Sequence, residues 1–474
     1  VTLRRAGESR LLQPSEYEIS GVKQIGPVSF RMVKPWLENG GEASLQTGDR
    51  ISVEWSGSPR AGTPIPRALV PVLRSTIDNW ESVSSQFTIS TYPGDYLIIT
   101  DDVYLPYLSD YVRWKTRQGF RVTVKAASDL GGTAPAIRDA IRAEYATSNG
   151  QLAYVLIIGD ADNSHPDNVN MVPAFFYESP STGDQNVTDH PYALMDDDYF
   201  ADLFVGRLSV DSVLELNTVL NKILRYESTP PESDWSENAL LIAGNYSNTP
   251  PNPITPVWTT RWLRGKLAEY GYSQIDSVYY PPTQLGQQTI ADHINDGVGI
   301  VNYRGWADAN GWQYPQFKIS DMTSLINNAP YTPIITSIVC NTGDFANTVD
   351  PVFGEQWMRL GTPTNPKGAA GFFGPSDLHT STKFNNSICA GFYEGLLVEG
   401  VHDLGAAAYR GKMQLYRGFP LERGDEEWVE FYFHVYNILG DPSTEIRTRR
   451  PEDPDVDLPG EMAIGSTTLD MHID

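Results

Sequence analysis

Three polar clusters, each directly after an apolar run, carry the side chains that could do chemistry. One is the cluster 340–344, which starts at Cys340 and follows the apolar run 334–339; the others are 303–308 and 374–379. A thiol at the end of a strand can act as a nucleophile if a nearby histidine favours its deprotonation, and a backbone amide there can stabilise an oxyanion. The alternative is that Cys340 is an inert buried residue, as free cysteines often are.

The amino-acid composition excludes several classes of protein and of binding partner. The chain has 474 residues, a net charge of −24 and 59 acidic residues, so nucleic acid and anionic membranes are not expected partners. Its two cysteines, Cys340 and Cys389, are too few for a disulfide framework or a cysteine-built metal site, and whether they pair stays open. No apolar run approaches the ~20 residues of a membrane span. Abundant Tyr, Trp, Asn and Gly with little Lys indicates a secreted or cell-surface protein.

The first 92 residues have a different pattern of apolar and polar residues from the rest of the chain. Residues 17–33 and 49–56 alternate apolar and polar side chains and are separated by Gly, Pro and Asn, a pattern typical of half-buried antiparallel strands. We therefore expect a small β-rich module over 1–92.

From Tyr96 onward, apolar strands alternate with amphipathic helices, which favours parallel sheets covered on both faces. The pattern predicts two sequential α/β subdomains, 93–232 and 233–448, divided near Pro230-Pro231, and a linker with the start of a further β domain over 449–474. The predicted strands are 96–100, 120–125, 153–160, 202–209, 238–246, one near 277, 298–305, 332–340 and 368–377; the predicted helices are 104–119, 134–148, 212–228, 258–270, 287–296, 384–398 and 426–438.

Five ordered motifs in this chain match a known family. "YVLIIGD", "DDDYFADLFVGRLS", "GIVNYRGW", "IVCNTGDF" and "YNILGDPSTEIRT" stand in the order and approximate spacing of the gingipain-type cysteine peptidases, family C25 of the clan with the caspase-like fold. The resemblance runs from about Tyr96 to Arg447. It implies a two-subdomain α/β catalytic unit, usually preceded by a pro-segment and followed by an immunoglobulin-like domain.

The resemblance also implies roles for individual residues. Cys340 matches the nucleophile, and Asp202, just before the "FVGR" run, matches the acidic residue that orients the base. The backbone amides of Cys340 and Ala307 would form the oxyanion hole. However, Trp306 stands where the family has its catalytic histidine, and an indole has no basic nitrogen.

Among the seven histidines, His379 is the one expected near the thiol. It follows the predicted strand after the one that ends at Cys340, and neighbouring parallel strands end at the same edge of a sheet. We therefore predict a relocated Cys340–His379 dyad, with Asp377 or Asp308 orienting the imidazole. Its alternative is a hydrogen-bonded loop histidine in a vestigial cleft. His434 is interpreted as structural, and His190 is expected in a surface loop.

Weaker signals concern metals and the walls of the cleft. The acidic runs 101–102, 160–162 and 196–198 offer oxygen ligands, and the resemblance leaves structural calcium open; helix capping and loop solvation explain these runs equally well. No cofactor is expected to be required. Trp306 and Trp312 would place aromatic surface beside the cleft.

The sequence thus predicts a secreted cysteine endopeptidase that acts on a peptide or protein substrate through a thioester on Cys340. Two other functions stay open. One is a catalytically inactive homologue that serves as a cell-surface or assembly scaffold, with self-association. The other is a cysteine acyltransferase, since acyl transfer and hydrolysis share their first step.

Overall fold

The computed structural model of the protein describes residues 2–5, 8–13, 17–35, 50–52, 62–161, 171–245, 255–450, 456–457 and 472–473. A single ten-stranded sheet organises the described chain, and its strand order is β15-β14-β16-β20-β21-β22-β13-β10-β8-β9. In that order the strands are β15 (Gln274–Tyr280), β14 (Asn238–Gly244), β16 (Ile300–Arg304), β20 (Ile334–Ser337), β21 (Gly371–Pro375), β22 (Tyr436–Gly440), β13 (Phe204–Leu208), β10 (Leu152–Ile158), β8 (Asp95–Thr100) and β9 (Arg121–Ala126).

The sheet consists of two parallel halves that run in opposite directions. Neighbouring strands from β15 to β21 are parallel, β21 and β22 are antiparallel, and neighbouring strands from β22 to β9 are again parallel. The prediction of two separate sheets is therefore wrong, although the α/β class is confirmed. Because the halves are antiparallel, residues just after β20 and residues just before β13 lie at the same edge of the sheet.

β22 joins the two halves, and the sequence prediction missed it. The predicted helix 426–438 is in fact α12 (Trp428–Val435), which passes directly into β22. Two helices with no counterpart in the prediction, α9 (Phe353–Arg359) and α11 (Leu404–Gly418), also pack on the sheet. The other nine strands of the sheet and the other predicted helices lie close to their predicted ranges, whereas the helix Ile319–Leu325 and the short strands within 175–188 and 307–318 had no counterpart in the prediction.

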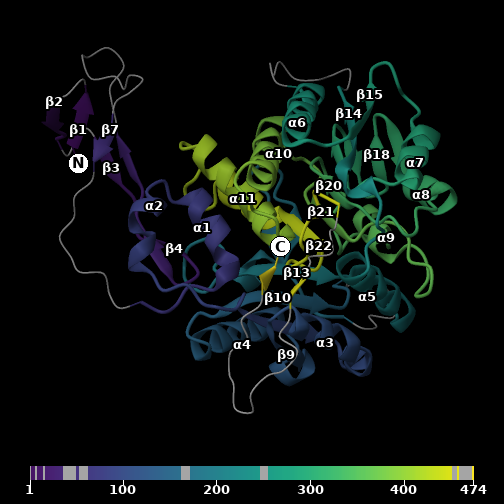
Figure 1. The fold of residues 1–474 in the computed structure, drawn as a ribbon, viewed down its shortest axis with the longest axis horizontal. Coiled ribbons are helices and arrows are strands. Elements are labelled where there is room, and N and C mark those ends of the chain that lie inside the picture. Colours follow the sequence, from purple (N-terminus) through teal and green to yellow (C-terminus); the bar gives the residue numbers. More distant parts are fainter. Residues whose placement is uncertain are drawn as a thin grey trace.

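Two rows of helices cover the sheet (Figure 1). In one row α6, α10, α11 and α1 contact one another in that order, and in the other α7, α8, α9, α5 and α3 do so. Their bounds are α1 (Val70–Thr76), α3 (Ser109–Arg117), α5 (Val213–Ser228), α6 (Pro256–Tyr270), α7 (Gln287–Asp296), α8 (Ile319–Leu325) and α10 (Thr382–Leu397); α2 (Trp80–Val83) and α4 (Ala134–Thr147) complete the described α-helices.

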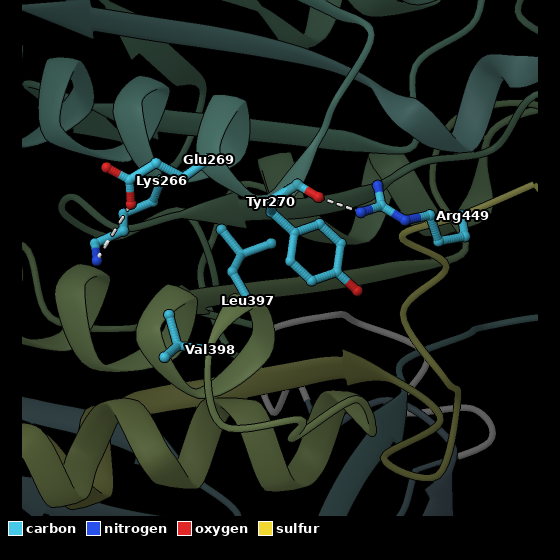
Figure 2. A pocket seen from close by; sticks show the side chains of 6 residues that line it. All are labelled: Lys266, Glu269, Tyr270, Leu397, Val398 and Arg449. Carbon is cyan, nitrogen blue, oxygen red and sulfur yellow. Dashed lines mark hydrogen bonds and ion pairs between the residues drawn. The ribbon is translucent and has the colours of Figure 1, made fainter.

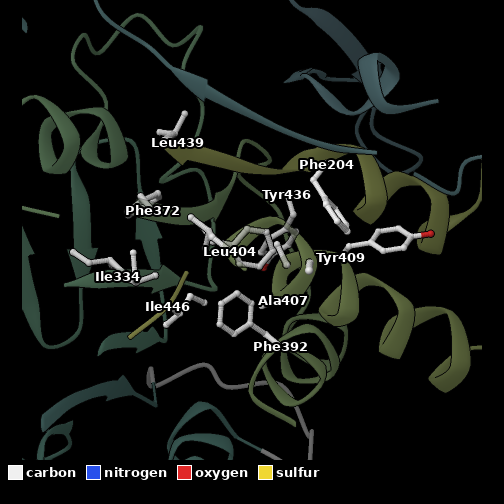
Figure 3. Close-up of a cluster of buried hydrophobic side chains, with 14 of the residues drawn as sticks. Phe204, Ile334, Phe372, Phe392, Leu404, Ala407, Tyr409, Tyr436, Leu439 and Ile446 are labelled. Atoms are coloured by element: carbon white, nitrogen blue, oxygen red, sulfur yellow. The ribbon is translucent and has the colours of Figure 1, made fainter. Parts of the chain in front are cut away.

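Between the sheet and the first row of helices lies a dense apolar layer (Figure 3). Ile334 and Phe373 from the sheet, Phe392 from α10 and Leu404 from α11 are all at most 1% exposed, and Phe373 stacks on Phe392. Burying a side chain of this size removes roughly 1.5–3 kcal/mol of unfavourable hydration. This layer fixes β21 and β22 relative to α10, and so sets the position of the loops at the carboxyl ends of β20 and β21.

The N-terminal region combines short strands with helices. The antiparallel hairpin β4 (Lys23–Ile25)–β5 (Val28–Phe30) lies within a second pair, β3 (Tyr17–Ile19)–β6 (Val33–Pro35), as the alternation predicted. The other sheet of this region pairs β1 (Thr2–Arg5) with β2 (Glu8–Leu11) and β7 (Arg50–Ser52). Residues 67–76 and 80–86 are helical, which the alternation did not indicate. Of the predicted strand 49–56 and the tail 449–474, most lies outside the described residues, apart from β23 (Val456–Asp457) and β24 (His472–Ile473), which pair.

Candidate functional site at the end of β20

Cys340 lies three residues beyond β20, at the start of a tight turn. Asn341 has a φ of +53°, a left-handed backbone that few residues other than glycine adopt. Its side chain holds this shape by donating to Asp344 Oδ2 (3.0 Å) and to the carbonyl of Ser376 (2.5 Å). A Cβ on Gly343 would lie 2.5 Å from the carbonyl oxygen of Gly374, so the turn also requires glycine at that position. Strain of this kind is concentrated at functional sites, where it aims a side chain or an amide.

The Cys340 thiol is buried against a hydroxyl. Its side chain is 7% exposed, and Sγ lies 3.1 Å from Thr380 Oγ1 and 3.8 Å from the Thr380 carbonyl oxygen. Because Thr380 donates its own hydroxyl hydrogen to the carbonyl of Val339 (2.5 Å), its oxygen accepts from the thiol. Burial raises the pKa of Cys340 to about 11. Cys389, the other free cysteine, is fully buried and has a pKa raised by the same cause.

The amide of Cys340 is available to a ligand. Within the described chain, no backbone or side-chain group accepts a hydrogen bond from it, whereas the next amide, that of Asn341, donates to the Asp377 carbonyl (2.8 Å). Ala307, the second predicted donor of the oxyanion hole, belongs to the small sheet of β17 (Ala307–Asp308), β18 (Gly311–Gln313) and β19 (Gln316–Lys318), where it pairs with Trp312. Its role in an oxyanion hole stays a prediction.

The loop after β21 holds the His379 ring beside Asp184. Asp377 Oδ2 accepts from the His379 backbone amide (3.0 Å), and the His379 ring, with a side chain 51% exposed, has its Nε2 3.9 Å from Asp184 Oδ2. No imidazole is among the described hydrogen-bond partners of Cys340. The relocated dyad therefore stays a prediction, and using it would require the His379 side chain to turn.

Asp377 is the predicted orienter that the structure does bring close to Cys340. It is 1% exposed, and within the described residues its Oδ1 has no hydrogen-bond partner. Burial, with a smaller contribution from the nearby carboxylates of Asp184 and Asp344, raises its pKa to about 6. The other predicted orienter, Asp308, instead closes the β17–β18 turn, since its carboxylate accepts from the Asn310 amide (2.9 Å) and the Gln313 amide group (2.7 Å).

The two tryptophans have different surroundings. Trp312 is fully buried, stacks on Tyr303 with ring centroids 4.6 Å apart, and donates from Nε1 to Ser337 Oγ (2.9 Å) at the end of β20. Trp306 is 44% exposed and stacks on Tyr314, with centroids 5.9 Å apart. Trp312 therefore supports the strand that presents the thiol, and Trp306 forms exposed aromatic surface at the end of the neighbouring strand β16.

Asp202 lies at the same edge of the sheet but not beside the thiol. It precedes β13, which is separated from β20 by β22 and β21, so three strand spacings of about 4.8 Å place the two strand ends roughly 14 Å apart. Its carboxylate accepts from the Met195 amide (2.9 Å) and from Gln24 Nε2 of the N-terminal hairpin (3.4 Å). Burial raises its pKa to about 8. Its role as an orienter of the base is not tested by these contacts.

Arg304, the last residue of β16, is a functional candidate that the sequence reasoning missed. It is 1% exposed, and its guanidinium donates to the carbonyl of Ile338 and to Asn386 Oδ1. Within the described residues it forms no ion pair, and its Nε has no hydrogen-bond partner. Its positive charge lowers the pKa of Cys340, although less than burial raises it. An arginine inside the predicted strand 298–305 was the available signal.

Acidic residues at the opposite edge do not form a calcium site. Oxygens of Asp160, Asp211 and Asp350 lie within 4.8 Å of one another, but the Arg359 guanidinium contacts all three carboxylates and Glu355 at 2.5–3.3 Å. The arginine already supplies the cation, so a calcium ion does not fit without displacing it. In the other acidic runs, Asp101, Asp196 and Asp198 accept from backbone amides two residues ahead, and Asp102 accepts from Ser128; Asp162 lies outside the described residues.

A pocket of about 420 Å³ lies away from this site (Figure 2). Its walls come from the last turns of α6 and α10 and from Arg449, whose guanidinium covers the Tyr270 ring at 4.2 Å. α6 begins at the carboxyl end of β14 and runs back along the sheet, so Tyr270 lies at the edge opposite Cys340. The lining residues are Lys266, Glu269, Tyr270, Leu397, Val398 and Arg449.

A strand-end thiol with a free amide, set in a strained turn of a two-half α/β sheet, defines a protein of the cysteine peptidase-like class. Comparison with known proteins agrees. The family model described as "Peptidase family C25" matches residues 89–447. The chain belongs to this family.

Relatives and solved structures point to the gingipains. Gingipain R2 of Porphyromonas gingivalis is 24% identical over 414 residues, which cover 85% of this chain and 53% of the relative, and a Lys-gingipain of the same organism is 23% identical over 395 residues, 78% of this chain and 22% of the relative. The chain thus spans about half or less of the length of these relatives. The crystal structure of the Arg specific cysteine proteinase gingipain R is 25% identical, has a TM-score of 0.71, and is matched over 80% of this chain and 84% of that chain. These matches confirm the predicted family and the caspase-like fold.

Proposed function

We propose that this chain is a catalytically inactive (silent) member of its family. It binds a peptide or protein partner at the edge of the sheet where Cys340 lies, and it does not hydrolyse that partner at neutral pH. One observation carries the proposal. The buried Cys340 thiol donates to the Thr380 hydroxyl, and its pKa is raised to about 11 by burial, which no neighbouring imidazole opposes.

The small ionised fraction of the Cys340 thiol favours a catalytically inactive protein over one that hydrolyses its substrate slowly. With a pKa of about 11, roughly one thiol in ten thousand is ionised at pH 7, and the thiolate is the nucleophile. A hydroxyl is not a general base at that pH. Trp306, at the position that matches the family histidine, adds no basic nitrogen.

A cysteine endopeptidase remains the second candidate, and two observations favour it. The Cys340 amide lacks an acceptor among the described residues, as an oxyanion donor should, and Asn341 keeps the strained turn that aims this amide. In that case His379 would have to turn from Asp184 toward Cys340 when substrate binds.

Labelling with a thiol-reactive peptide ketone separates the two candidates. The protein is treated at pH 7.5 in a Cys389→Ala background, which leaves Cys340 as the only thiol, and intact mass reports adduct formation. The silent account predicts no adduct within hours, and a tryptic map that finds Cys340 unmodified. Rapid labelling that is lost in His379→Ala would overturn it and establish the dyad; Lys266→Ala, remote from the site, is the matched control.

The proposed partner and location follow from the same features. Relatives whose names describe proteinases make a peptide or protein the proposed partner, and the chain's composition favours a location outside the cell or on its surface. Self-association as a surface scaffold is proposed with the silent account. In the described part of the chain, no helix has the length and apolar content needed to cross a lipid bilayer.

A further inference from the structure

Two histidines and a lysine lie together in the interior beneath a hairpin next to the candidate site. The hairpin consists of β11 (Phe175–Glu178) and β12 (Gln185–Thr188). His434 of α12 stacks on Tyr177 of this hairpin, with ring centroids 3.9 Å apart and planes 11° apart, and meets the ring of His190 edge to face at 5.0 Å. Both histidines are 4% exposed, so His190 does not lie in the surface loop that the sequence predicted.

The hairpin is also connected to the loop after β21, which lies beside the turn of Cys340. The carbonyl of Val187 accepts from Ser376 Oγ (2.8 Å) and from Asn437 Nδ2 (3.1 Å), and Thr188 Oγ1 donates to the carbonyl of His434 (2.7 Å). At the turn of the hairpin, Asp184 faces the ring of His379. Movement of the hairpin would therefore shift residues 376–380, the loop after β21 that lies beside Cys340.

The groups around the two imidazoles disfavour protonation of either ring. Lys412 of α11, which donates to the Phe433 carbonyl (2.6 Å), lowers the pKa values of both histidines. The carboxylate that faces His434 is Glu430 of the same helix, 3.9 Å from Nε2 and itself near Asp425, Glu426 and Tyr177. His190 Nε2 pairs with the Tyr199 carbonyl (2.8 Å), and within the described chain His434 Nδ1 has no partner.

Burial sets the protonation of this cluster. It lowers the pKa of His434 to about 3 and that of Lys412 to about 7, and it lowers the pKa of His190 well below its usual value. Lys412 therefore takes up its proton near neutrality, and both imidazoles stay neutral in the closed structure at pH 5.

We propose that the β11–β12 hairpin is an acid-released flap beside the Cys340 edge, held closed by the neutral imidazole of His434 under Tyr177. When the hairpin lifts, His434 meets water and regains a pKa of about 6.5. Below that pH the open state binds a proton that the closed state excludes, so acid favours opening. This inference does not depend on whether Cys340 is catalytically active.

Linkage gives the size of the effect. For one imidazole whose pKa is far below 5 when closed and about 6.5 when open, the opening equilibrium rises about 30-fold between pH 7.5 and pH 5. Exposure of His190 in the same motion would increase this factor.

Amide hydrogen exchange of residues 175–188 tests the proposal. The rates at pH 7.5 and 5.0 are each divided by the intrinsic rate at that pH, and the wild-type protein should show about 30-fold more frequent opening at pH 5.0. In His434→Phe, which keeps an aromatic ring under Tyr177 but cannot be protonated, the increase should fall at least tenfold. If this variant does not fold, His434→Gln replaces it.

Two controls make the result specific to the hairpin. His293→Phe removes a partly buried imidazole on α7, which contacts Asp276, and should leave the acid effect unchanged. The central strand β10 reports global opening in the same spectra. Equal acceleration of β10 and the hairpin, or an undiminished acid effect in the His434 variant, would overturn the proposal.

Discussion

Two buried titratable centres of this molecule respond to burial in opposite ways. At the carboxyl end of β22, Asp441 accepts from Lys115 Nζ (2.6 Å), from the Tyr96 hydroxyl (2.7 Å) and from the Tyr111 hydroxyl. Although both charged groups are buried, the pKa of Asp441 is lowered and that of Lys115 is raised, because each stabilises the charge of the other. Glu227 adds a second carboxylate 2.9 Å from Lys115 Nζ.

At the carboxyl end of β20, burial raises the pKa of Cys340 more than Thr380 and the charge of Arg304 lower it. The thiol has a hydroxyl beside it where Asp441 has an ammonium group, and its pKa is raised to about 11. Burial alone therefore does not decide whether an interior group is charged. Its charge state is decided by whether a partner of opposite charge, or a base, lies beside it.

The largest expected effect comes from breaking the charged centre. Lys115→Met leaves Asp441 and Glu227 buried without their cation, and we expect a loss of about 3–5 kcal/mol in the free energy of unfolding. Urea unfolding followed by circular dichroism measures it. The matched control is Lys125→Met, whose ion pair with Glu144 is partly exposed and should contribute at most about 1 kcal/mol. A loss at Lys115 no larger than that of the control would contradict the comparison.

Placing a base beside the Cys340 thiol should favour its ionised form, and so make it more like the charged Asp441 centre. Trp306→His places an imidazole at the position that the sequence resemblance predicts to match the family histidine. We expect iodoacetamide to alkylate Cys340 at least tenfold faster at pH 7.5, because an adjacent imidazolium stabilises the thiolate. Intact mass against time, in the Cys389→Ala background, gives the rate. Trp306→Gln should show no such gain, and an equal gain in both variants would mean that removal of the indole merely opens the site.

Removing the hydroxyl should have the smallest effect. Thr380→Val deletes the hydrogen-bond partner of the thiol, and the Thr380 contact lowers the pKa of Cys340. We expect a further rise in that pKa, alkylation at pH 9.5 slower than in the wild type, and a loss of about 1 kcal/mol in stability. Thr380→Ser, which keeps the hydroxyl, should behave as the wild type does. Faster alkylation in the valine variant would show that the hydroxyl shields the sulfur instead.

Local patterns predicted most of the elements but not how the two halves join. Near-continuous apolar runs located β8, β10 and β14, and helical spacing located most of the helices, because each of these elements carries its own apolar signal. β22 was missed because "WVEFYFHVYNILG" is mostly apolar and aromatic, and such a run fits a buried helix and a buried strand equally well. No turn residue marks the change from α12 to β22 at Tyr436.

The sequence located Cys340 at the end of a strand but did not predict its surroundings. Cys340 could be located because strand ends gather residues at one edge of a sheet, and the turn after it has the residues that such a turn requires. The direction of His379 could not, since it depends on Asp377 Oδ2 accepting from its backbone amide. Lys115 reads as a surface lysine of an amphipathic helix, and only Asp441, far along the chain, shows that it is buried.

The most direct test of the central claim is the pKa of the Cys340 thiol. The alkylation rate of the Cys389→Ala protein is followed from pH 6 to the highest pH at which it stays folded, with circular dichroism as the check on folding. The account predicts a tenfold rise for each pH unit with no plateau below pH 10, and a fall in stability above about pH 9, where an unfolded thiol ionises and the buried one does not. A plateau that begins between pH 6 and 8 would show a thiolate already formed near neutrality, and would contradict the silent assignment.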